Sequence, residues 1–224
     1  MIISAGVSAD EPFFASQKGM VITNAFLDNK GKIQSYIRMT ISDVRGSDSD
    51  MIIDYTVELL DGNRHPSGNA GIRGYSVAVT GGILEMKQDD MMDLFLASRN
   101  MNYQLTAGTL NIPSNMTGGS RIEDSWMNMI VKIPIIGEIT TNTMITNISC
   151  TGIETVTVPA GTFEAYKVTM TSITNIKGWG SGSPVTSNIT TWYVRGIGAI
   201  KSVNVDDKGK IGSSTELFEL SPKS

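Results

Sequence analysis

The sequence has little of what catalytic and metal centres are built from. It contains one cysteine, Cys150, and one histidine, His65, among 224 residues. A zinc site needs more Cys or His ligands than this. A Ser-His-Asp or Cys-His arrangement would have to use His65, which lies in a polar turn beside a proline. We therefore expect an exposed loop histidine, no catalytic residue, no metal site and no cofactor.

The single cysteine also excludes an intramolecular disulfide. Cys150 lies in an apolar, Thr-rich stretch, and we expect it to be a small buried hydrophobic residue. A reactive thiol is the alternative. Such thiols are activated by a neighbouring Lys, Arg or His, and none stands beside Cys150 in the sequence.

Charge is scarce as well. Charged residues make up 18% of the chain and the net charge is −4, whereas soluble domains have roughly 25% charged residues. No stretch is strongly basic, so nucleic acid and anionic membrane surfaces, which are bound through Lys and Arg clusters, are excluded as partners. No apolar run reaches the length of about 18 residues that a transmembrane helix needs.

Four acidic residues stand close together, namely Asp43, Asp48, Asp50 and Asp54. Oxygen ligands at short spacing can bind calcium, but this spacing fits no EF-hand loop. A hydrated loop entering a strand is the favoured interpretation, with calcium as the alternative.

Strand patterns dominate what is present. Runs of alternating and β-branched residues, bounded by turn residues, predict strands at 20–27, 34–41, 51–60, 75–80, 83–87, 126–136, 139–148, 156–158, 162–171, 186–194, 199–204 and 214–220. Pro134 within one of these runs indicates an edge strand or a bulge. One short helix is predicted at 91–99, capped by Asp89 or Asp90, and a loop at 111–121.

Turn chemistry predicts how these strands connect. Hairpins are expected at residues 28–32, at Gly81-Gly82 and at Pro159-Ala160-Gly161, where proline presets φ and glycine supplies a positive φ. The sequence at 206–211 repeats the chemistry of 28–33, which favours one turn solution used twice over an internal duplication. No linker or shift in composition is visible, so residues 10–224 are predicted to form one mostly antiparallel β domain.

The first nine residues have the character of the end of a signal peptide. They are apolar and small, and Val7-Ser8-Ala9 places small residues where signal peptidase cleaves. We interpret residues 1–9 as a signal-peptide remnant, which predicts Sec export to the periplasm or cell envelope of a Gram-negative bacterium. The alternative is a frayed N-terminal strand.

Methionine is abundant, at 13 residues. Flexible thioethers suit adaptable apolar surfaces, so some of them are candidates for lining a lipophilic cavity, although ordinary core filling is the favoured interpretation. The candidate ligand-binding residues are Met91, Met92, Phe95, Met127, Met129 and Met144. Met86, Met101 and Met170 belong to the same wider set.

The C-terminal third carries three segments with a familiar pattern. They are TVPAGTFEAYKV at 157–168, TWYVRGIGAIK at 191–201 and DKGK at 207–210. Together they resemble the TapB-like family of exported bacterial proteins of unknown function. Val158 and the pair Ala199-Ile200 depart from that pattern at positions without chemistry.

The resemblance implies a fold and a compartment. The TapB-like family looks related in fold to the LolA/LolB lipoprotein carriers, which implies a strongly curved antiparallel sheet, an open or half barrel, with one short helix packed against it. It implies no activity, because a fold does not fix a function.

Two functional hypotheses follow. The first is a non-enzymatic envelope protein that binds a lipid or another apolar or amphipathic small molecule in the concave sheet, with an apolar cavity under residues 91–96. The alternative is a structural or interaction module that pairs its edge strands with another envelope protein. An enzyme ranks third, because no catalytic motif is present.

Overall fold

The computed structural model describes residues 11–47, 49–69, 71–135, 137–178 and 182–221. Within them the chain forms thirteen strands and one helix. In chain order these are β1 (Val21–Asp28), β2 (Ile33–Ser47), β3 (Asp50–Asp61), β4 (Ile72–Thr80), β5 (Ile83–Lys87), α1 (Asp89–Ser98), β6 (Asn102–Ala107), β7 (Thr109–Pro113), β8 (Ser125–Ile133), β9 (Gly137–Val158), β10 (Gly161–Lys177), β11 (Val185–Val194), β12 (Gly198–Asp206) and β13 (Ile211–Ser221).

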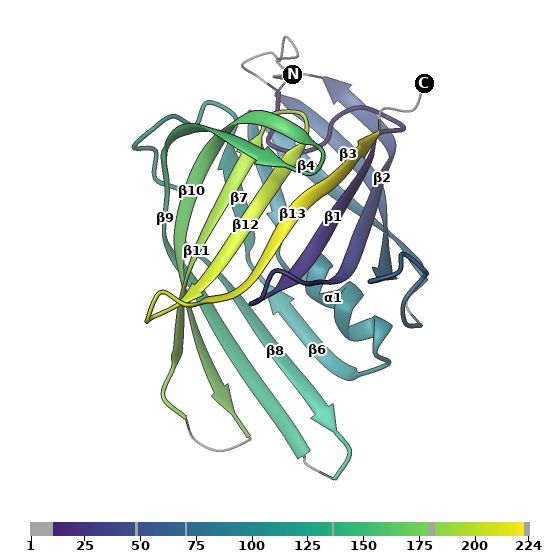
Figure 1. The fold of residues 1–224 in the computed structure, drawn as a ribbon, viewed down its shortest axis with the longest axis vertical. Helices are drawn as coiled ribbons and strands as arrows, with labels where there is room; N and C mark the ends of the chain where they lie inside the picture. Colours follow the sequence, from purple (N-terminus) through teal and green to yellow (C-terminus); the bar gives the residue numbers. More distant parts are fainter. Residues whose placement is uncertain (1–10, 48, 70, 136, 179–181, 222–224) are drawn as a thin grey trace.

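All of the strands belong to one antiparallel sheet that is nearly closed into a barrel (Figure 1). The strand order is β6-β8-β9-β10-β11-β12-β13-β1-β2-β3-β4-β5-β7. The strands at the two ends of this order, β6 and β7, are separated in sequence only by Gly108, whose amide donates to the Trp126 carbonyl at 2.8 Å. The chain itself therefore joins the two edges of the sheet. The predicted mostly β fold with one packed helix is confirmed.

Three hairpin turns use the same local hydrogen bonds. The side chains of Asp28, Asp61 and Asp206 each accept from the backbone amides two and four residues further along the chain. Gly31 and Gly209 occupy the positive-φ position of the first and third turns, at φ 75° and 78°. An aspartate that bonds its own following amides stabilises a turn without tertiary contacts, which is why the turns at 28–32 and 206–210 could be predicted.

Several predicted boundaries are corrected. The predicted loop at 111–121 begins later, because β7 extends to Pro113 and pairs with β5. The strand predicted at 126–136 ends at Ile133, so Pro134 follows β8; β8 pairs on both sides and is not an edge. The helix forms as predicted, but its N-cap is Gln88 without a side-chain cap, not Asp89 or Asp90.

The longest hairpin folds over the outside of the sheet. The predicted strands at 139–148 and 156–158 are one strand, β9, which pairs with β10 along most of its length. In Figure 1 the β9–β10 turn crosses over β11 and β12, and the Ala160 amide donates to the Leu217 carbonyl of β13 at 3.2 Å. Phe163, just after the turn, is 1% exposed. The 157–168 motif therefore has a structural role, because it holds the β9–β10 turn against β13.

The segment that precedes β1 enters the barrel and fills part of it. Phe13 and Ala15 are fully buried and Phe14 is nearly so. The Phe13 ring meets Tyr166 edge-on at a centroid distance of 4.8 Å and lies 6.3 Å from Tyr193. Burial raises the pKa of Tyr193 to about 12. These contacts make the N-terminal segment part of the core rather than a loose tail.

Hydrogen bonds and a cation fix this segment in place. The Gly196 amide donates to the Pro12 carbonyl at 2.8 Å, and Arg195 Nη1 donates to the Glu11 carbonyl at 3.1 Å. The Arg195 guanidinium also lies 4.6 Å from the centroid of the Phe13 ring. A cation over an aromatic face is attracted by the ring quadrupole, so Arg195 holds both the backbone and the ring of this segment. The predicted cleavage site after Ala9 lies outside the described residues.

Candidate functional site

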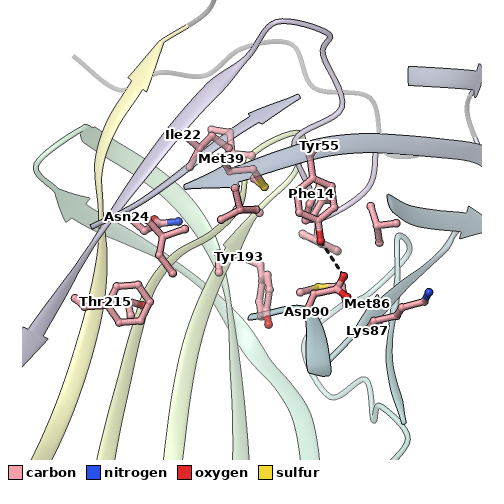
Figure 2. Close-up of a pocket in the computed structure, with 18 residues that line it drawn as sticks. Phe14, Ile22, Asn24, Met39, Tyr55, Met86, Lys87, Asp90, Tyr193 and Thr215 are labelled. Carbon is pink, nitrogen blue, oxygen red and sulfur yellow. Dashed lines mark hydrogen bonds between the residues drawn. The ribbon is translucent and has the colours of Figure 1, made fainter. Parts of the chain in front are cut away.

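The interior of the barrel keeps a pocket of about 260 Å³ beside this N-terminal segment (Figure 2). Its walls come from the segment itself, from the first three strands, from β4, β5 and the start of α1, and from β11 to β13. The lining residues are Phe13, Phe14, Ile22, Asn24, Phe26, Ile37, Met39, Tyr55, Val57, Val77, Met86, Lys87, Asp90, Tyr193, Ile197, Gly198, Ala199 and Thr215.

Most of this lining is apolar because of strand alternation. Every second residue of a strand points to the same side of the sheet, and Ile22, Asn24 and Phe26 of β1 all line the pocket. Ile37 and Met39 of β2 continue the same surface. The pocket is thus the unfilled part of the barrel interior, walled by branched, aromatic and thioether side chains.

A carboxylate stands at one side of the pocket. Asp90, in the first turn of α1, accepts a hydrogen bond from the Tyr55 hydroxyl at 3.2 Å (Figure 2). Burial raises the pKa of Asp90 above its ordinary value of 3.8. Burial and the negative charge of Asp90 also raise the pKa of Tyr55. Lys87 lines the same edge but is exposed and extends away from Asp90 in Figure 2.

A second, more polar pocket adjoins the first. It has a volume of about 490 Å³ and is lined by Ser42, Asp54, Tyr55, Thr56, Gly74, Tyr75, Ser76, Lys87 and Asp90. Tyr55, Lys87 and Asp90 are common to both pockets. These three residues therefore form the boundary between an apolar chamber and a polar one.

Two further aromatic rings flank Tyr55, the hydrogen-bond donor to this carboxylate. The Phe14 and Tyr55 rings lie 5.2 Å apart and the Tyr55 and Tyr75 rings 5.8 Å apart. Asp93, one helical turn after Asp90, is bound differently: it accepts from Arg73 and from the hydroxyls of Tyr75 and Tyr103. Asp93 thus fixes α1 to β4 and β6, whereas Asp90 faces the pocket.

Two of the methionines predicted to bind a ligand share a face of the sheet. Met127 and Met129 are two residues apart on β8, and both are half-buried. Val131 continues that face and pairs with Tyr103 of β6, whose hydroxyl donates to α1. Met127 and Met129 therefore lie on the side of β8 that turns toward the helix, but they do not line the pocket.

The other candidates are dispersed. Met144 pairs with Trp126, the neighbour of Met127, so it points to the opposite face of the sheet, and it is 45% exposed. Phe95 is 41% exposed on α1 and Met92 is half-buried there. The side chain of Met91 lies outside the described part of the structure. The methionines that do line the pocket are Met39, which the sequence analysis missed, and Met86 from the wider set.

Of the residues considered for catalysis or metal binding, Asp54 lines the polar pocket, Asp48 lies outside the described residues, and the others lie elsewhere. His65 is an exposed turn residue whose side chain is 77% accessible, and Cys150 is 1% exposed. Of the four clustered aspartates, Asp43 pairs with Lys18 and Arg45, and Asp54 with Arg45. Among the described residues no group of three or more His, Cys, Asp or Glu side chains is placed to hold a metal ion. No helix in the described ranges is long and apolar enough to cross a membrane.

Two solved structures share this fold. One, from Bacteroides fragilis NCTC 9343, is provisionally described as an exported protein with a YmcC-like fold. It is 19% identical, with a TM-score of 0.75 over 95% of this chain and 100% of the other. A lipoprotein, also provisionally so described, from Parabacteroides distasonis ATCC 8503 is 18% identical, with a TM-score of 0.76 over 94% and 99% of the two chains. At such identities the likeness establishes the fold.

Sequence comparison gives the family. No curated protein matches the chain. The profile of the DUF3108-like family matches residues 17–217, which include β1 to β12 and the C-terminal segments that resemble the TapB-like pattern. The narrower TapB-like assignment and the comparison with lipoprotein carriers remain predictions. With most of its length matched, the chain belongs to the DUF3108-like family.

Proposed function

We propose that the protein binds an apolar or amphipathic small molecule in its interior pocket and does so without catalysis. The pocket itself carries the proposal: it is lined mainly by apolar side chains and has a few polar groups at one side. That combination of apolar walls and sparse, localised polar groups is typical of ligand sites.

The size of the pocket limits the ligand. A volume of about 260 Å³ corresponds to roughly nine water molecules of about 30 Å³ each. A single medium-length alkyl chain or a small ring system fits such a space. A lipid with two long acyl chains exceeds it, so we propose a single-chain or compact ligand.

We also propose that the protein acts in the bacterial cell envelope. The small residues at Val7-Ser8-Ala9 support export, as do the provisional descriptions of the two structural neighbours as an exported protein and a lipoprotein. Mass spectrometry of the native protein should find Asp10 as its first residue in the envelope fraction. An intact Met1 on cytosolic protein would contradict this.

Blocking the pocket tests ligand binding. Ala199 lines the pocket yet is exposed, so Ala199→Phe introduces bulk at the opening with little disturbance of the core. Ser213→Phe places the same ring on an exposed site of β13 that does not line the pocket. Binding of the neutral fluorescent probe N-phenylnaphthylamine should weaken by about tenfold or more in Ala199→Phe and stay unchanged in Ser213→Phe. No saturable binding to the wild type, or equal binding by all three proteins, would overturn the proposal.

A further inference from the structure

The aromatic clusters of the protein differ in one respect. The Phe13 and Tyr166 rings share the guanidinium of Arg195, at 4.6 and 5.1 Å from the ring centroids. On the outside of the barrel, Arg64 lies 5.6 Å from the Tyr36 ring and 5.7 Å from that of Phe218.

The third cluster, formed by Phe14, Tyr55 and Tyr75, has no such cation. No Lys or Arg of the described residues lies over these rings. This is the cluster that borders both pockets, since Phe14 lines the apolar one, Tyr75 the polar one and Tyr55 both.

The carboxylate beside these rings has a cation nearby, the exposed Lys87 of the same pocket edge, but is not paired with it. Of the described residues, Tyr55 alone donates a hydrogen bond to Asp90, and none forms an ion pair with it. Asp93 on the same helix has Arg73. Burying a carboxylate that is not ion-paired is unfavourable, and this cost outweighs the lowering effects of Tyr55 and Lys87, so the pKa of Asp90 is raised.

We infer that the pocket selects an amphiphile with an alkylammonium headgroup. The inference rests on the proposed function and names the chemistry of its ligand. The ammonium group lies against Asp90 and the faces of Phe14, Tyr55 and Tyr75, while the alkyl chain extends into the apolar pocket. Aromatic faces together with a carboxylate are the groups that attract a quaternary or protonated amine, within about 6 Å of a ring centroid.

The two adjoining pockets suit the two ends of such a molecule. The apolar chamber takes the chain against residues such as Ile22, Met39 and Val57. The polar chamber begins at Asp90 and keeps the headgroup in contact with water. An anionic headgroup would instead meet the unpaired carboxylate of Asp90 at the boundary, and like charges repel; Asp54 beyond it is already paired with Arg45.

Three probes with alkyl chains of nearly equal length separate the effect of the headgroup from that of the chain: decyltrimethylammonium, decanol and decanoate. Each competes with N-phenylnaphthylamine below its micelle concentration. The wild type should bind decyltrimethylammonium about tenfold or more tighter than decanol, as a desolvated cation–π contact allows, and decanoate most weakly.

Matched variants show which side chains cause the preference for decyltrimethylammonium over decanol. Asp90→Asn should bring the affinities for decyltrimethylammonium and decanol close together. Asp89→Asn changes the adjacent acid, which does not line either pocket, and should keep the preference. Tyr55→Phe retains the ring and should keep it, whereas Tyr55→Leu should reduce it.

The outcomes distinguish this inference from the proposed function. Binding of decanol without preference for decyltrimethylammonium, tightest binding of decanoate, or an unchanged preference in Asp90→Asn would overturn the alkylammonium inference and leave ligand binding standing. Failure of every probe to bind would overturn the proposed function itself.

Discussion

Two aromatic clusters lie on opposite faces of the sheet and differ in how their charge is balanced. Tyr36 and Ile37 are neighbours on β2, and Ile37 lines the pocket while Tyr36 packs with Phe218 outside it. The outer cluster has its own cation, since Arg64 lies over both rings and pairs with Glu219. We call a cluster of this kind saturated. In the inner cluster, Phe14, Tyr55 and Tyr75 with Asp90, no Lys or Arg of the described residues lies over the rings or forms an ion pair with the carboxylate.

The difference separates stability from function. A saturated cluster holds two parts of the chain together, as Arg64 connects the turn at Asp61 to β13. In the inner cluster the rings and the carboxylate face a pocket. A bound ligand can therefore supply the stabilising contact with a cation that the protein does not supply there. Variants of the saturated clusters should therefore change folding stability, and variants of the open cluster should change binding.

The largest effect is expected in the saturated cluster inside the barrel. Phe13→Ala removes a ring that is 1% exposed and that contacts Tyr166, Tyr193 and Arg195. It should lower the free energy of unfolding by about 3–5 kcal/mol, because a buried cavity remains. Denaturant titration measures this. Phe95→Ala, the same change at a site 41% exposed, should cost less than about 1 kcal/mol, and a similar loss in both variants would contradict the buried role of Phe13.

The β9–β10 turn, which belongs to neither cluster, supplies the next effect. Gly161 has φ 149° at the start of β10, and Gly161→Val should cost on the order of 1–2 kcal/mol through backbone strain. Thr162→Ser, one residue further into the strand, keeps the hydroxyl that bonds Thr157; it is the control and should be close to neutral. Ligand affinity should be unchanged in both. Loss of binding without loss of thermal stability would show that the 159–161 turn is a binding loop.

A smaller effect is expected from the charge of Asp90. Its pKa is raised in the folded protein, chiefly by burial, with Asp89 and Asp93 also raising it and Tyr55 and Lys87 lowering it. The folded state thus binds the proton more tightly than the unfolded state. The contribution of Asp90 to stability therefore falls as pH rises from the ordinary value of 3.8 through the raised pKa.

Asp90→Asn removes this dependence. Its thermal midpoint should exceed that of the wild type at neutral pH, and the difference should shrink as the pH approaches the ordinary aspartate value. Asp89→Asn again provides the matched control. A lower midpoint for Asp90→Asn at neutral pH would show that the carboxylate stabilises the free protein and is not held open for a ligand.

The smallest effect concerns the outer cluster. Arg64 has a positive φ of 69°, at the position that Gly31 and Gly209 occupy in the two equivalent turns. Arg64→Ala loses the contacts with Tyr36 and Phe218 and keeps the unfavourable backbone conformation, whereas Arg64→Gly loses the same contacts and relieves it. The Gly variant should have the higher thermal midpoint of the two, and neither should change ligand affinity. Equal thermal midpoints would show that the positive φ at residue 64 does not strain the backbone.

Local chemistry made much of the fold predictable. The turns at 28–32, 81–82 and 159–161 carry their own signals, and each forms where expected. Helix α1 follows from its length and pattern. The closure of the sheet through Gly108 could not be predicted, because the pairing partners of β6 and β7 are distant in sequence.

The site was less accessible to sequence reasoning. Its walls come from segments as far apart as Phe13 and Thr215, which only barrel closure brings together. Asp90 was interpreted as a helix cap, because acids at a helix start usually have that role, and its position beside Tyr55 depends on tertiary packing. Methionine content did point to an apolar interior, but strand parity decides which methionines face the pocket, and it places Met144 on the opposite face of β9 from Thr143.

The most direct test of the account is a crystal structure of the protein grown with decyltrimethylammonium. The account predicts the alkyl chain in the interior pocket, beside Met39 and Val57, with the nitrogen within about 6 Å of the Tyr55 ring centroid and facing Asp90. An amphiphile bound only on the outer surface, or one lying in the pocket with its headgroup away from Asp90, would contradict it.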